Sequence, residues 1–129
     1  ISVSAFLLNR SSDLAIIVRK NLQPHAEIWG IGTKNHGTSN GFFYKDRYHQ
    51  DYFVRRTKIN SDYYSLNCLL RDEWQAQYVD LIGLTLQPDS TVLVFTPDRF
   101  FITYDNMHLT PFGARFYAKL ISCGIDLGI

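Results

Sequence analysis

The chain has 129 residues, of which 46% are hydrophobic and 19% charged, so it is long enough for one globular domain and short for two. Its 13 basic side chains are balanced by 12 acidic ones, which gives no electrostatic footprint for nucleic acid or an anionic membrane surface. The apolar runs are far shorter than the roughly 18 to 20 residues of a membrane span. We expect a single domain, 1–129, with no nucleic-acid partner and no membrane span.

The chain starts on an alternating apolar run, Ile1–Phe6, without an initiating Met or a signal-type segment, which favours a fragment of a longer protein. Cys68 and Cys123 lie far apart without a paired spacing, so we expect two buried free thiols and no disulfide framework. Three histidines lack the spacing of metal ligands: His25, His36 and His49. We expect neither a metal nor another cofactor.

The first quarter of the chain is expected to form one βαβ unit. Ile1–Asn9 has the β-branched and aromatic character of a strand, and His25–Gly32 is a second strand. Between them, Ser11 or Ser12 can cap a short helix that ends before Pro24. A right-handed crossover of this kind pairs the strands in parallel, so the chain is predicted to be an α/β protein.

The middle of the chain is less regular. Thr33–Tyr44 is a polar loop at the carboxyl end of the second strand, where open α/β sheets bind ligands. Asp46–Glu73 is rich in charges and aromatic residues and is expected to contain one or two helices. Two further strands are predicted at Gln77–Ile82 and Thr91–Phe95, and Phe100–Ile102 is a candidate edge segment.

The last helix has the clearest start signal. Thr110 is placed to be its N-cap, and Pro111 fits the first helical position, where a missing N–H costs nothing. The periodicity predicts an apolar face made of Phe112, Phe116 and Leu120.

Asp105 and His108 lie three residues apart just before this helix, so both side chains can emerge from one tight loop. A carboxylate beside an imidazole fixes its tautomer and stabilises the imidazolium, which is what a general base needs. The simpler interpretation of an isolated Asp-x-x-His pattern is structural: Asp105 opens a turn and His108 packs on the helix.

The longer pattern around this pair is Asp-x-x-His-Leu-Thr-x-x-Gly-Ala, followed by a helix. It resembles the last sequence block of the SGNH (GDSL-like) hydrolases and esterases, and Val94–Tyr104 is similar to the lead-in of SGNH domains related to bacterial sugar O-acyltransferases. The resemblance implies a three-layer α/β/α fold with a mainly parallel, flavodoxin-like sheet. It also implies a triad in which Asp105 orients His108 and His108 acts as the base.

A second block, Gly32–Gly37, follows a predicted strand and contains Gly-Thr-Lys-Asn. It resembles the block from which SGNH enzymes donate an Asn side chain to the oxyanion, and this implies that Asn35 is the oxyanion donor. Such a donor must lie about 3 Å from the developing oxyanion, held by a rigid strand end. Asn40 is an alternative for the same role.

The nucleophile block of this family, a strand running into Gly-Asp-Ser, has no counterpart here. Asn9–Asp13 follows a strand but lacks that order, and it lies too close to Asn35 in sequence. Ser11 and Ser12 are better explained as helix caps than as nucleophiles. We therefore expect the SGNH-like domain 1–129 to be incomplete at its N-terminus, with its nucleophile outside this chain, so that the chain alone is inactive.

The resemblance implies a serine esterase or an O-acetyltransferase that acts on acyl esters, acetyl esters above all, of a carbohydrate or on a small ester. Water as acceptor gives the esterase and a sugar hydroxyl gives the transferase. One alternative is a non-catalytic SGNH-like module that binds a glycan or a partner. Another is a flavodoxin-like binding domain, in which Asp105 and His108 would not be hydrogen-bonded. The family implies the bacterial cytoplasm or cell envelope without deciding between them.

Overall fold

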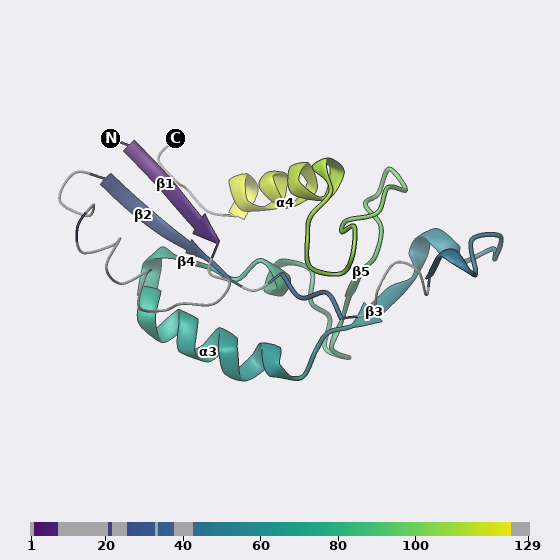
Figure 1. The fold of residues 1–129 in the computed structure, drawn as a ribbon, viewed down its shortest axis with the longest axis horizontal. Helices are drawn as coiled ribbons and strands as arrows, with labels where there is room; N and C mark the ends of the chain where they lie inside the picture. The colour runs from purple at the N-terminus through teal and green to yellow at the C-terminus, as the bar shows by residue number, and fades with distance from the viewer. Residues whose placement is uncertain (1, 8–20, 22–25, 33, 38–42, 125–129) are drawn as a thin grey trace. The chain divides into compact units, whose positions relative to one another are not determined.

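The computed structural model describes residues 2–7, 21, 26–32, 34–37 and 43–124. These residues belong to two compact units (Figure 1). Unit 1 contains those up to Thr33 and those from Asp62 to Leu81, and unit 2 contains those from Lys34 to Ser61 and from Ile82 onward. The secondary structure is mixed α/β with short strands, which confirms the α/β class.

Unit 1 is built on a parallel sheet. β1 (Ser2–Leu7), β2 (Ala26–Ile31) and β4 (Tyr78–Val79) lie in the order β1-β2-β4, and both pairings are parallel (Figure 1). The first two predicted strands and their parallel pairing are thus confirmed. The helix expected between them lies outside the described residues except for Asn21, which is helical.

The strand predicted at Gln77–Ile82 is reduced to the two residues of β4. The last residue of the predicted span, Ile82, already begins a 3₁₀-helix, η3 (Ile82–Leu84). The first residue of β4 pairs with Gly30 of β2 and the second with Ile31. A strand this short adds few backbone hydrogen bonds to the sheet. The prediction is therefore confirmed in position and wrong in length.

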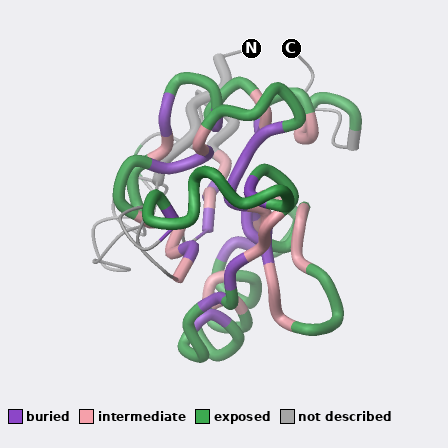
Figure 2. The backbone as a smooth tube through the Cα atoms, turned by 90° about the vertical axis from the view of Figure 1, so that its right-hand side faces the viewer, coloured by how far each residue is buried: buried purple, intermediate pink, exposed green. Residues whose placement is uncertain are grey.

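α3 (Asp62–Trp74) confirms a helix in the second part of the segment predicted to be helical, and the 3₁₀-helix η2 (Gln75–Gln77) follows it. Trp74 anchors the helix: it is 2% exposed, and a Cβ added to Gly30 of β2 would come within 2.5 Å of its indole ring. The rest of α3 is largely exposed, as the green coil at the bottom of Figure 2 shows. Tyr63 is the other buried residue of the helix, and its hydroxyl donates to Asp80 Oδ2 at 2.6 Å, so an apolar contact and a polar one both attach α3 to the rest of unit 1.

The first part of that segment is not an α-helix. It contains the 3₁₀-helix η1 (Tyr52–Val54) and β3 (Arg56–Lys58), which pairs antiparallel with β5 (Thr91–Leu93) in unit 2. The prediction was wrong because Thr57 is buried between two less buried neighbours, so that the local period is two. Three residues are too few for that period to be recognised in the sequence.

Unit 2 also contains the predicted strand at Thr91–Phe95 and the candidate edge segment. β5 ends at Leu93, and Phe95 then forms an isolated antiparallel bridge with Phe101. Both expectations are confirmed in part. The aromatic rings of Phe95 and Phe101 lie 4.5 Å apart, in a core whose other members are Phe43, Tyr52 and Val94.

α4 (Pro111–Gly124) begins where the sequence predicts, and Thr110 caps it by accepting a hydrogen bond from the Gly113 N–H to its Oγ1 at 3.0 Å. The predicted apolar face is wrong by part of a turn. Gly113 and Tyr117 are buried, whereas Phe112 is 41% exposed. The reason is a close backbone approach: a Cβ on Gly113 would overlap the carbonyl oxygen of Ile102.

The two cysteines are free thiols as expected, but both are exposed and not buried. Cys68 lies on the solvated side of α3, and Cys123 lies in the last turn of α4. The apolar character of a thiol does not by itself place it in the core, because here larger side chains fill the buried positions.

No helix among the described residues has both the length and the apolar character that a membrane span requires.

Candidate functional site

The site predicted around Asp105 and His108 is a closed loop of unit 2. Thr103 and Leu109 form an antiparallel bridge, and the Tyr104 N–H donates to the His108 carbonyl at 2.8 Å. Within the loop Asn106 has φ +70°, the left-handed conformation that Asn tolerates better than most residues. The chain therefore reverses between Asp105 and His108 and brings their side chains together.

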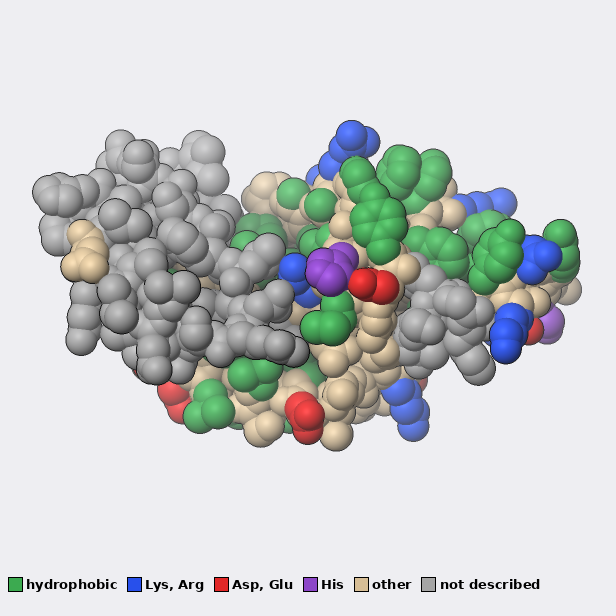
Figure 3. All heavy atoms as spheres, viewed as in Figure 1, with side chains coloured by type: hydrophobic (Ala, Val, Ile, Leu, Met, Phe, Trp, Pro, Cys, Tyr) green, Lys and Arg blue, Asp and Glu red, His purple; other side chains and the backbone are tan. Residues whose placement is uncertain are grey.

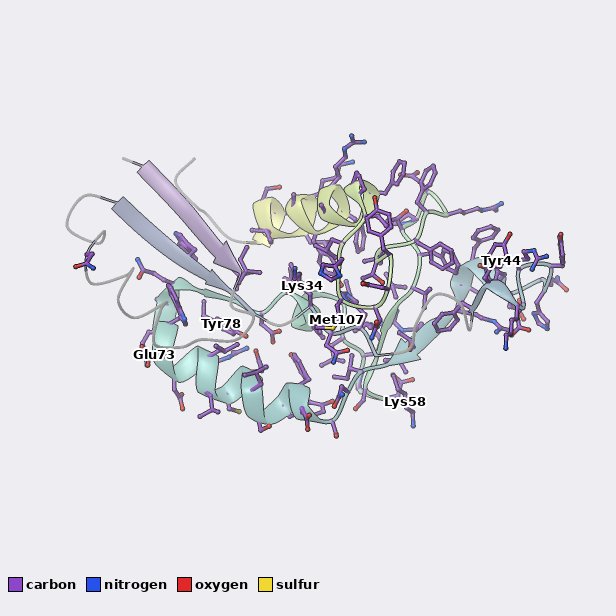
Figure 4. All side chains as sticks on the ribbon, in the orientation of Figure 1. Lys34, Tyr44, Lys58, Glu73, Tyr78 and Met107 are labelled. Carbon is purple, nitrogen blue, oxygen red and sulfur yellow. The ribbon has the colours of Figure 1, made fainter. Side chains whose placement is uncertain are left out.

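The Asp105 carboxylate accepts three hydrogen bonds. Its Oδ2 contacts His108 Nδ1 at 2.7 Å, and its Oδ1 accepts from the backbone N–H of His108 at 2.8 Å and of Met107 at 3.1 Å. These bonds, that of the His108 backbone first, lower the pKa of Asp105 to about 2. The carboxylate is ionised at neutral pH and fixed by its own loop, which Met107 marks in Figure 4.

The geometry determines the tautomer of His108. An ionised carboxylate can only accept, so Nδ1 of His108 carries the proton, and Nε2 of the neutral ring is an acceptor. Among the residues that the structure describes, none is hydrogen-bonded to this Nε2. The side chains of His108 and Asp105 are 68% and 55% exposed. The pair can therefore take a proton from a hydroxyl group presented to it, with the imidazolium stabilised by Asp105.

Asn35 lies in the loop 34–37 of the same unit and is half-buried. Its Oδ1 accepts a hydrogen bond from the Gly37 N–H at 3.0 Å, a local turn that fixes the carboxamide plane. Because the oxygen faces Gly37, the Nδ2 group on the same carbon points to the opposite side. This orientation is compatible with a donor, and it is set by the loop itself.

Asp105 and His108 form a dyad, and the loop that carries them, residues 104–108, is called the dyad loop. Asn106 ties the Asn35 loop to this dyad loop. Its carbonyl accepts from the His36 N–H at 2.7 Å, and its Nδ2 donates to the Gly37 carbonyl at 2.6 Å, so both bonds hold the two residues that follow Asn35. Its own N–H donates to Thr103 Oγ1 at 3.0 Å. The structure thus brings Asp105 and His108 into direct contact and joins the Asn35 loop to them through Asn106. Asn106 was not predicted as a site residue, although an Asn inside a four-residue turn is a signal for φ > 0.

Within the loop 34–37, His36 is buried and its ring is hydrogen-bonded on both nitrogens. Nδ1 donates to the Lys34 carbonyl at 2.5 Å, so Nε2 accepts from the Tyr117 hydroxyl at 3.0 Å, and Thr85 Oγ1 lies 3.2 Å from that hydroxyl. Burial, the largest effect, lowers the pKa of His36, and the nearby Lys34 charge acts in the same direction. A neutral His36 is therefore a support that connects the Asn35 loop to α4, and its fixed partners argue against a reactive role.

The sequence suggested that the end of a strand holds Asn35. β2 ends at Ile31, and Asn35 lies in the loop that follows it. Its support is the hydrogen bonding of its own loop and of Asn106. Ser11 and Ser12, the alternative nucleophiles, and Asn40, the alternative donor, lie outside the described residues.

The described residues contain no group of three or more His, Cys, Asp or Glu side chains that could hold a metal ion. Compared with models of protein families, with curated proteins and with solved structures, the chain has no significant match.

Proposed function

We propose that this chain supplies the base half of a serine-esterase-type site, in a protein of the SGNH class with a flavodoxin-like three-layer fold. The observation that carries the proposal is the 2.7 Å hydrogen bond between Asp105 Oδ2 and His108 Nδ1, with Nε2 turned away from it. A flavodoxin-like binding domain with a chance Asp-x-x-His has no need for this bond. The exposure of the pair supports a site that receives its nucleophile from another segment of the protein.

The reaction would be acyl transfer through a covalent intermediate. A serine hydroxyl from outside these 129 residues attacks the ester carbonyl, and its proton passes to His108 Nε2. The carbonyl C–O bond to the alcohol then breaks, and the alcohol leaves with that proton. Water or a sugar hydroxyl next attacks the acyl-serine, again giving its proton to His108, which returns it to the serine. The products are an acid or a new ester, with the serine restored.

Asp105 keeps Nδ1 protonated throughout, so that Nε2 is the nitrogen that exchanges protons. Asn35 would donate its Nδ2 N–H to the oxyanion that forms during each attack. The substrate class is an acyl ester of a carbohydrate or a small ester. The triad does not select the acceptor, so esterase and O-acyltransferase activity share this mechanism.

The test compares hydrolysis of p-nitrophenyl acetate by the full-length protein and by its His108→Ala variant. Loss of a general base should lower kcat/KM by about 10²- to 10⁴-fold. The matched control is His49→Ala, since His49 is an exposed histidine of the same unit and should leave the rate unchanged. Equal hydrolysis by wild type and His108→Ala would refute the proposed base.

A serine-directed phosphonate probe locates the nucleophile in the same protein. We expect mass spectrometry to find the adduct on a serine outside residues 1–129, and Asp105→Asn to slow its formation. An adduct on Ser11 or Ser12 would place the nucleophile on this chain. Absence of any serine adduct in an active protein would contradict acyl-serine chemistry.

A further inference from the structure

A pocket of about 540 Å³ lies in unit 2, directly beside the dyad loop. Two stretches of chain line it, 100–104 and 110–112, with Tyr44 on a further side. These stretches are the two arms of the loop that carries Asp105 and His108 between them. The volume falls in the range of about 300–1,000 Å³ that is typical of small-molecule sites.

Aromatic side chains form much of the pocket wall. Phe100 and Phe112 are stacked face to face, with ring centroids 3.8 Å apart and an interplanar angle of 5°. Tyr44 and Tyr104 also line the pocket, and all four rings are between 41% and 64% exposed. Figure 3 shows hydrophobic side chains gathered over the loops after β5 and the start of α4. Exposed apolar surface concentrated in this way marks a binding site more often than a solvated face.

The two threonines of the lining are already used by the fold. Thr103 Oγ1 accepts from the Asn106 N–H at 3.0 Å. Thr110 Oγ1 donates to the Phe101 carbonyl at 2.6 Å and accepts the cap bond from Gly113. The described lining holds no charged side chain. A sugar ring needs several hydrogen-bonding partners, and besides these two threonines only Tyr44 and Tyr104 have polar side-chain groups in the lining, so an apolar group fits better.

We infer that this pocket binds the acyl group of the substrate, and that this group is hydrophobic and larger than acetyl. The inference rests on the proposed function, which places the ester carbonyl at His108. An acetyl group would leave most of the volume unfilled. A butyryl or phenylacetyl group would instead bury apolar surface against Phe100 and Phe112, while the alcohol part of the ester stays outside the pocket.

The kinetic test uses the full-length protein with p-nitrophenyl acetate, butyrate and phenylacetate. Burial of two further methylene groups predicts a rise in kcat/KM on the order of 10-fold from acetyl to butyryl. Phe112→Ala and, separately, Phe100→Ala should reduce hydrolysis of the larger esters more than that of the acetyl ester. The matched control is Tyr48→Ala, an aromatic residue of unit 2 that is 88% exposed and does not line the pocket; its rates should not change.

A binding test separates the pocket from the chemistry. Phenylacetamide is added to the full-length His108→Ala protein, and saturation-transfer NMR detects its ring protons. We expect binding, and its loss when Phe112→Ala is combined with His108→Ala. Circular dichroism of each variant checks folding, and Phe100→Ala serves as the second variant if Phe112→Ala unfolds.

The outcomes are distinguishable. No preference for larger acyl groups, together with acetate hydrolysis that depends on His108, would overturn the acyl pocket and leave the proposed function intact. Binding that depends on Phe112, together with hydrolysis that does not depend on His108, would refute the proposed function and the acyl assignment with it. Preference and binding that both depend on Phe112 support the inference.

Discussion

Each of the two units of the chain is stabilised internally in a different way. Unit 1 has three strands in one parallel sheet and a helix anchored by the buried Trp74 and Tyr63, so its order comes from a regular ladder and the packing of this helix. The ladder of unit 2 is only three residues long on each strand, and side chains bonded to the backbone fix its loops. The candidate site lies entirely in unit 2. The proposed residues thus lie on loops that specific hydrogen bonds position, and the regular unit carries none of them.

Arg56 shows how unit 2 is built. Its Nη2 donates to the carbonyls of Thr85 and Thr91 at 2.7 and 3.0 Å, and its Nε donates to Thr91 Oγ1 at 2.9 Å. One guanidinium thus ties β3 to the first residue of β5 and to Thr85 before it. Asn106, Thr110 and Tyr117 serve the same purpose nearer the dyad. Both units contain packing and polar contacts, since unit 2 has the core around Phe95 and in unit 1 the Tyr63 hydroxyl donates to Asp80 Oδ2 at 2.6 Å. The comparison is tested at the Trp74 contact of unit 1 and at single polar groups of unit 2.

The largest effect is expected in unit 1. Trp74→Ala removes the buried indole that packs on Gly30 and should lower the free energy of unfolding by about 3–5 kcal/mol. Urea unfolding followed by the fluorescence of Trp29 measures this change, because Trp29 is the other tryptophan of the chain and also lies in unit 1.

Leu69→Ala is the matched control on the same helix. Leu69 is 68% exposed, and its removal should change the free energy of unfolding by no more than about 0.5 kcal/mol. If Trp74→Ala were as mild as this control, packing on Gly30 would not be what holds α3.

A smaller effect is expected at Asn106 in unit 2. Asn106→Gly keeps the φ of +70° and loses the bond from Nδ2 to the Gly37 carbonyl, which should cost about 1 kcal/mol. Asn106→Ala loses the same bond and also strains the backbone, so it should cost about 1 kcal/mol more. Hydrogen exchange of the His36 amide, which is bonded to the Asn106 carbonyl, reports the local stability.

The order of the two variants is the decisive result. The alanine variant should exchange fastest, the glycine variant less fast and the wild type slowest. An Asn106→Gly protein indistinguishable from wild type would show that the Nδ2 bond does not couple the two loops.

The smallest effect is a pH dependence confined to unit 2. Burial lowers the pKa of His36 below its ordinary value of 6.5, so the unfolded chain binds a proton in a pH range where the folded chain does not. The free energy of unfolding should therefore fall as the pH is lowered through 6.5 toward the folded pKa, and change little above 6.5. Urea midpoints at pH 7.5, 6.5 and 5.5, followed by exchange of unit 2 amides, measure this slope.

His36→Gln should flatten the slope, whatever it does to stability at pH 7.5. His49→Gln should not, because His49 is exposed. If the slope survived His36→Gln and disappeared with His49→Gln, His49 and not His36 would cause the pH dependence.

Local sequence patterns were sufficient to predict an element where residues within or next to it specify it. The first two strands follow from β-branched runs, and α4 follows from Thr110 as cap and Pro111 at its first turn. The prediction of helix failed at Arg56–Lys58, because pairing with β5 decides that segment and its partner lies far along the chain. The prediction of the buried face of α4 failed for a similar reason, since the close approach of the Ile102 backbone requires Gly113 on the buried side.

The sequence by itself determined that Asp105 and His108 share one loop ahead of a capped helix, because three residues of separation leave no other place for them. The tertiary structure decided that Asn106 joins this loop to the loop 34–37 that contains Asn35. It also decided that His36 is neutral and structural. The physical reason is range: caps, turns and the contact of Asp105 with His108 depend on neighbours in sequence, whereas the burial of His36 and the bonds between the two loops depend on groups brought together by folding.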